Sequence, residues 1–169
     1  MQQYLSILEK SWFELHQHYH FSEPQKIFNK LIVAYSEKQR AYHTSQHLYE
    51  CLVLFEFIRA DLHDANAVVL ALWFHDVIYD PQAKDNELQS AELFEQYLAQ
   101  DLSIDIVQKI KRWIIATQKH DLTDELDLQF VLDIDLAILA ASVERFAEYE
   151  QQIQQEYASS ICKFPLQEI

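Results

Sequence analysis

The sequence predicts an all-helical domain, and three observations lead to that prediction. The chain has 169 residues, half of them hydrophobic, which is enough for one domain with a sizeable core. It has no glycine and only three prolines, whereas tight hairpins and phosphate-binding loops depend on glycine. Apolar residues recur every three to four positions along most of the chain, as on the buried face of a helix. We therefore expect about eight helices rather than a β-rich fold, a Rossmann domain or a P-loop enzyme.

The N-terminal part of the chain holds three of these helical segments. The first covers residues 4–19, where apolar side chains form one stripe. Ser22 is expected to cap the second, which has a proline in its first turn. Thr44 or Ser45 starts the third, which we expect to continue to about Leu62.

The fourth helix is the most apolar segment of the chain, and we expect it to be buried on nearly all sides. Asp64 or Asn66 starts it, and an unbroken apolar run follows over residues 67–74. We expect it to stop near Tyr79, because Pro81 disfavours helical conformation in the residue before it.

Four further helices are expected in the second half. One begins at Asp85-Asn86-Glu87, with acidic residues at the positive end of its dipole, and Ser103 caps the next. After an acidic, irregular stretch over residues 121–127, an apolar run over residues 130–139 contains two carboxylates. Ser142 caps the last helix.

We interpret residues 1–169 as one domain without linkers or repeats. Its core is expected over about residues 24–158, followed by a loosely held tail over residues 159–169.

The composition also limits the partners and the compartment. The formal net charge of −14 disfavours nucleic acid polymers and anionic membranes, although converging carboxylates could hold a divalent cation. Cys51 and Cys162 are isolated and show no metal-type spacing. With no signal peptide and no apolar run of membrane-spanning length, we expect a cytoplasmic protein.

Three apolar segments carry polar residues that a core should not contain: His43 with His47, His75-Asp76, and Asp133 with Asp135. Burying such groups costs several kcal/mol unless each finds a partner. A divalent metal is one partner that would satisfy them together, because His and Asp are preferred ligands of such ions. Buried ion pairs in a purely structural helical protein are the alternative.

The order of these residues resembles the HD superfamily of metal-dependent phosphohydrolases, and in particular its little-characterised predicted bacterial phosphohydrolases. The resemblance covers roughly residues 30–158. It lies in five motifs in the same order: Tyr42-His43-x-x-x-His47, Ala71-Leu-Trp-Phe-His75-Asp76-x-x-Tyr79-Asp80, Asp85-Asn86-Glu87-x-x-Ser90-Ala91, Thr117-x-x-His120 and Asp133-x-Asp135-Leu136-x-Ile-Leu139.

The resemblance implies an HD-type helical domain with four metal ligands: His47, His75, Asp76 and Asp135. The metal would be Mn, Fe, Mg, Ni or Zn. The implied activity is hydrolysis of a phosphate ester of a small molecule, with a nucleotide as the expected substrate. The alternative is a metal-bearing nucleotide- or ligand-binding regulatory module with little or no turnover.

Further roles are expectations of the same kind. His43 would protonate the leaving group, and Asp76 or Glu87 would accept the proton of the attacking water. Each of these residues has a structural alternative, such as a helix cap for Glu87. Residues expected to contact the substrate or to support the ligands from behind are Arg40, Asp80, Asn86, Lys119, His120 and Asp133.

The chain departs from the family pattern in two places. Ala140 stands where the family commonly has glycine, which is a mild change. The relatives continue for a few dozen residues beyond the last helix expected here. We expect that difference to open one side of the pocket or to leave an apolar patch for a second copy of the chain, which makes a homo-oligomer an open alternative.

Overall fold

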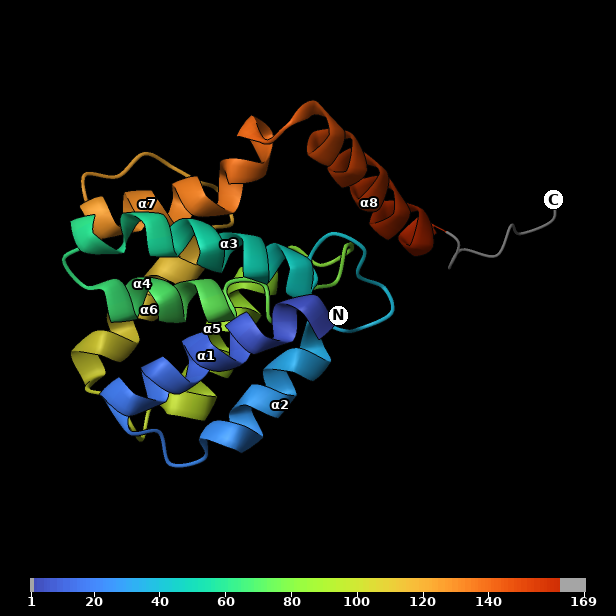
Figure 1. Ribbon diagram of the computed structural model, residues 1–169. Helices are drawn as coiled ribbons and strands as arrows, with labels where there is room; N and C mark the ends of the chain where they lie inside the picture. The colour runs from blue at the N-terminus through green and yellow to red at the C-terminus, as the bar shows by residue number, and fades with distance from the viewer. Residues whose placement is uncertain (1, 162–169) are drawn as a thin grey trace, which may run out of the picture.

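The computed structural model describes residues 2–161, and every regular element in that range is helical (Figure 1). The prediction of an all-helical fold is therefore confirmed. The elements, in chain order, are α1 (Gln2–Tyr19), α2 (Pro24–Ala34), α3 (Ser45–Ile58), a 3₁₀ turn η1 (Arg59–Asp61), α4 (Ala65–Phe74), α5 (Asn86–Leu98), α6 (Ile104–Ala116), α7 (Leu126–Asp135), a 3₁₀ turn η2 (Leu136–Ala140) and α8 (Val143–Ile161).

Helix α4 is the centre of the fold. Every side chain from Ala67 to Phe74 is buried, as its uniformly apolar sequence predicts. The helices that lie beside it are α1, α3, α5, α6 and α7. The other helices therefore surround α4. Because α4 is packed on all sides, the position of the residues that directly follow Phe74 is fixed by the core.

Most helix starts follow the predicted caps. Thr44, rather than Ser45, caps α3 by accepting the backbone N–H of Gln46. Asp64, rather than Asn66, caps α4, and Ser103 caps α6. The predicted cap of α2 is wrong, because Ser22 donates its hydroxyl to Asp101 instead and Glu23 precedes the helix without a side-chain cap.

Two predicted boundaries also need correction. Helix α4 ends at Phe74 rather than near Tyr79, so His75 and Asp76 lie just beyond it. Helix α7 begins at Leu126, inside the stretch that was expected to be irregular. The buried Asp127 in its first turn accepts backbone N–H groups at the start of α4, which fixes α7 against that helix.

Helix α8 leads away from η2, and its C-terminal part reaches the loop between α2 and α3 (Figure 1). The predicted tail over residues 159–169 lies mostly outside the described residues. None of the described helices is long and apolar enough to cross a membrane.

Candidate metal centre

Four ligand side chains meet at one end of α4. His47 lies in the first turn of α3, His75 and Asp76 directly follow α4, and Asp135 is the last residue of α7. Because α3 and α7 both pack beside α4, these three chain segments converge. The described residues contain a group formed by these four side chains whose ligand atoms lie close enough to hold one metal ion.

The distances within this group are those of atoms around a shared centre. His47 Nε2 lies 3.1 Å from His75 Nε2, 3.4 Å from Asp76 Oδ2 and 3.2 Å from Asp135 Oδ1. His75 Nε2 lies 3.0 Å from Asp76 Oδ2 and 3.4 Å from Asp135 Oδ1. Neighbouring ligands of one ion at about 2.1 Å are roughly 3.0 to 3.4 Å apart in octahedral or tetrahedral coordination. The four side chains therefore fit a divalent metal.

Hydrogen bonds among the four side chains cannot satisfy all of their buried polar atoms. Two protonated imidazoles would point N–H donors at each other across 3.1 Å, and two unprotonated ones would oppose their lone pairs. One shared proton serves a single contact, and Asp76 Oδ2 is buried without a hydrogen-bond partner among the described residues. A cation between the four atoms would satisfy all of them at once.

The electrostatics of the group favour positive charge at its centre. Burial lowers the pKa of His75, but Asp76 and Asp135 outweigh burial and raise it well above its usual range. Burial acts in the opposite direction on Asp135 and raises its pKa. The charge of His75 and hydrogen bonds with His120 and His47 outweigh burial and hold that pKa well below its usual range. Burial also raises the pKa of Asp76, but the nearby His75 and His43 hold it well below its usual range, so both carboxylates are ionised and available as ligands.

Two of the ligands, His75 and Asp135, are oriented by hydrogen bonds from the atoms that point away from the group. His75 Nδ1 donates to the carbonyl of Leu72 over 2.8 Å, which leaves Nε2 to face the other ligands. His120 Nε2 contacts Asp135 Oδ2 over 2.9 Å, so the second carboxylate oxygen, Oδ1, faces the group. His120 follows α6 with a φ of 52°, a left-handed conformation that histidine enters more readily than most residues and that directs the chain away from the helix.

Arg40 stabilises the loop that carries the ligands. Its buried guanidinium donates to the carbonyls of His43 (2.9 Å), Asp76 (2.7 Å) and Val77 (2.9 Å). These contacts tie the loop before α3 to the loop after α4. The guanidinium also pairs with Glu37, so these contacts match the second of the two roles expected for Arg40, support of the ligands from behind.

The Asp85-Asn86-Glu87 motif supports the same loop. The Asn86 side chain accepts the N–H of Asp80 and donates to its carbonyl, and Ser90 accepts the N–H of Ile78. Asp80 is exposed, and its carboxylate accepts the N–H of Gln82. Glu87 is half-buried, its carboxylate makes no hydrogen bond or ion pair with the described residues, and it lies outside the four-ligand group.

Two other predicted residues, Lys119 and Asp133, are exposed and also lie outside that group. His43 lies beside it, with its ring 6.0 Å from the ring of His47. His43 Nδ1 contacts Glu156 Oε2 over 2.8 Å, and the His43 ring stacks on Tyr79.

Sequence reasoning missed Glu156 and Cys51. Glu156 is buried in α8, at the position where the apolar stripe through Tyr149 and Ile153 continues, and an acidic residue in such a stripe was the available signal. The sulfur of Cys51 lies 3.7 Å from His47 Nε2, and a second group of possible ligands joins Cys51 to His47 and His75. Its spacing of four residues from His47 places both on one helix face.

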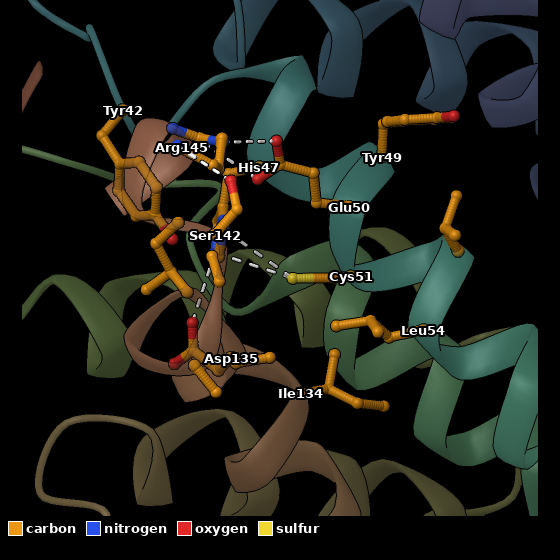
Figure 2. A pocket seen from close by; sticks show the side chains of 15 residues that line it. Tyr42, His47, Tyr49, Glu50, Cys51, Leu54, Ile134, Asp135, Ser142 and Arg145 are labelled. Carbon is orange, nitrogen blue, oxygen red and sulfur yellow. Dashed lines mark hydrogen bonds and ion pairs between the residues drawn. The ribbon is translucent and has the colours of Figure 1, made fainter. Parts of the chain in front are cut away.

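A pocket opens next to the ligands, between α3, α7 with η2, and α8 (Figure 2). Its volume is about 500 Å³, and His47 and Asp135 form part of its wall. Figure 2 shows His47 between Asp135 and Cys51, with Arg145 paired to Glu50 at 2.8 and 2.9 Å. The remaining wall is mostly apolar and includes Leu54, Ile134, Ala137, Ile138, Ala140 and Ala141.

Comparison with known proteins does not extend these findings, since no family model, curated protein or solved structure matches the chain. What the structure shows is an all-helical protein with a buried His/His/Asp/Asp group that can hold a metal ion.

Proposed function

We propose that this protein is a metal-dependent hydrolase of small phosphate esters with an HD-type site. The observation behind the proposal is the convergence of His47, His75, Asp76 and Asp135 on a space that suits one cation. The order of these four residues along an all-helical chain matches the motif order of the HD superfamily. Two His and two Asp ligands leave coordination positions for water and substrate.

The chain's own residues would divide the reaction as follows. When bound, a divalent cation lowers the pKa of a coordinated water and polarises a phosphoryl oxygen. Asp76 or Glu87 would accept the proton of the attacking water as the water oxygen forms its bond to phosphorus. The bond from phosphorus to the leaving oxygen breaks, the electron pair stays on that oxygen, and His43 supplies the proton.

The surroundings support a small substrate rather than a polymer. The pocket of about 500 Å³ beside His47 and Asp135 is large enough for a small organic group attached to the phosphate. In the pocket wall, the guanidinium of Arg145 is already paired with Glu50, so the metal would be the main cationic contact for the phosphate. A nucleotide is the substrate that we expect.

The proposal is tested by hydrolysis of a panel of phosphomonoesters and phosphodiesters, including nucleotides, with each candidate metal. We expect Asp76→Ala to abolish turnover while the helical circular dichroism spectrum is retained. Asp133→Ala is the matched control, because Asp133 is exposed and lies outside the ligand group. Tight nucleotide binding with no product under any condition would instead identify a regulatory module.

A further inference from the structure

We propose that Glu156 is the positioning residue for His43: it holds the imidazole with Nδ1 as hydrogen-bond donor, so that Nε2 is the nitrogen that protonates the leaving group. This inference rests on the proposed function, in which His43 is the general acid. It adds a residue 113 positions away in the sequence, on the last described helix.

The Glu156 carboxylate is fully buried and both its oxygens are used. Oε1 accepts the backbone N–H groups of Ala41 (2.7 Å), Tyr42 (2.8 Å) and His43 (3.1 Å). Oε2 accepts from His43 Nδ1 (2.8 Å) and from the Tyr79 hydroxyl (2.9 Å). One side chain of α8 thus holds both the backbone and the ring of His43.

This arrangement determines which ring nitrogen of His43 carries the proton. A carboxylate is only an acceptor, so His43 Nδ1 must be the donor in their contact. The neutral imidazole then has its lone pair at Nε2, and the imidazolium carries a transferable proton there. Burial raises the pKa of Glu156, but His43 and the backbone N–H groups outweigh burial and lower it to about 2, so the carboxylate is ionised at neutral pH.

The ring is also fixed in orientation and lies beside the metal ligands. It stacks on Tyr79 with centroids 4.0 Å apart and meets the ring of Tyr42 edge-on at 4.9 Å. His43 is close enough to Asp76 to contribute to the lowered pKa of that carboxyl. Its side chain is 20 % exposed, so the ring lies at the edge of the core rather than sealed inside it.

Anchoring α8 to the backbone before α3 accounts for only one of the two carboxylate oxygens of Glu156, Oε1. An amide oxygen in place of Oε1 could also accept the three backbone N–H groups, although more weakly than a carboxylate oxygen, and burying a carboxylate costs several kcal/mol that a glutamine would avoid. A residue that only anchored α8 would not need Oε2, the ionised oxygen that faces His43. A general acid does need that oxygen, because an adjacent carboxylate fixes the tautomer of the imidazole.

The test compares Glu156→Gln with Glu150→Gln, a matched control because Glu150 is exposed on the same helix. In Glu156→Gln the new amide would keep an oxygen for the backbone N–H groups but turn its NH₂ donor toward His43 Nδ1. Nitrogen-15 NMR of the imidazole, recorded where His43 is neutral, should show the Nδ1–H tautomer in wild type and in the control, and the Nε2–H tautomer in Glu156→Gln. An Nε2–H tautomer in wild type would overturn the proposal, whether or not the variant folds.

The kinetic arm separates positioning from general loss of structure. For an alkyl phosphate, whose leaving oxygen needs a proton, we expect Glu156→Gln to lose turnover by about 10²-fold or more. For 4-nitrophenyl phosphate, whose leaving group departs unprotonated, we expect a loss of only a few-fold. Equal losses with both esters would contradict the positioning role while leaving the phosphohydrolase proposal intact. If wild type hydrolyses no ester, the proposed function fails, and the tautomer measurement still decides whether Glu156 sets the state of His43.

Discussion

At the scale of single residues, the candidate metal ligands are oriented by groups that lie outside the ligand cluster. His120 contacts the outer oxygen of Asp135, and the carbonyl of Leu72 orients His75. Such contacts orient a ligand before the metal arrives, and their loss usually lowers metal affinity.

We therefore expect His120→Ala to weaken metal binding by about 10- to 100-fold, since Asp135 would lose the partner that directs its carboxylate. Isothermal titration of the metal-free protein with Mn²⁺ or Zn²⁺ measures the change. Lys119→Ala is the control, because Lys119 is the exposed neighbour outside the ligand group. An unchanged affinity in His120→Ala would show that Asp135 needs no such support.

Glu156 also makes a pH-dependent contribution to stability. Its folded-state pKa is about 2, below its ordinary value of 4.5, so it stabilises the fold fully above about pH 4.5. That contribution is lost as the pH falls through about 2, because the unfolded chain binds the proton first. We expect the difference in unfolding free energy between wild type and Glu156→Gln to shrink over this range in urea titrations. A difference that stays constant from pH 6 to pH 2 would contradict this account.

At the scale of elements, α4 determines where the site forms. Its Trp73 is fully buried, packs edge-on against Trp12 and Phe28, and donates to the hydroxyl of Ser11. The end of this rigid helix presents His75 and Asp76 to the ligands from α3 and α7.

We expect Trp73→Ala to lower the free energy of unfolding by about 3 to 5 kcal/mol, because it leaves a large cavity in the core and removes a hydrogen bond. Phe57→Ala is the control, since Phe57 is 80 % exposed on α3 and its loss should change stability by less than about 0.5 kcal/mol. Chemical denaturation followed by far-ultraviolet circular dichroism makes the comparison. A loss in Trp73→Ala as small as that in Phe57→Ala would contradict the central role of α4.

Element boundaries were predictable where local chemistry sets them. Thr44, Asp64 and Ser103 cap their helices through side-chain contacts two or three residues away, which a sequence displays directly. The end of α4 at Phe74 was not predictable in this way. The loop that follows it is held by Arg40 and Ser90, and these contacts depend on the tertiary fold.

At the scale of the whole molecule, polar residues that interrupt apolar segments pointed to a candidate site, and the resemblance to the HD superfamily then selected His47, His75, Asp76 and Asp135 among them. A polar residue in such a segment needs a partner, and one metal ion can serve all four. The partners of Arg40 and the role of Glu156 were not predicted, because these contacts form only when distant segments pack together.

The absence of glycine also shapes the whole chain. Two positions in the described residues adopt a positive φ, the conformation that glycine usually supplies after a helix, and both are histidines: His20 after α1 and His120 after α6. At His120 this conformation occurs together with a contact between the imidazole and the carboxylate of Asp135. A glycine there would complete the turn but leave that carboxylate without its imidazole partner.

The central claim is that His47, His75, Asp76 and Asp135 hold a metal ion, and metal analysis of protein purified without chelator tests it most directly. We expect stoichiometric divalent metal in wild type and in Asp133→Asn, and its loss in Asp135→Asn, with all three proteins equally helical. A folded wild-type protein that binds no metal at saturating Mn, Fe, Mg, Ni or Zn would contradict the claim.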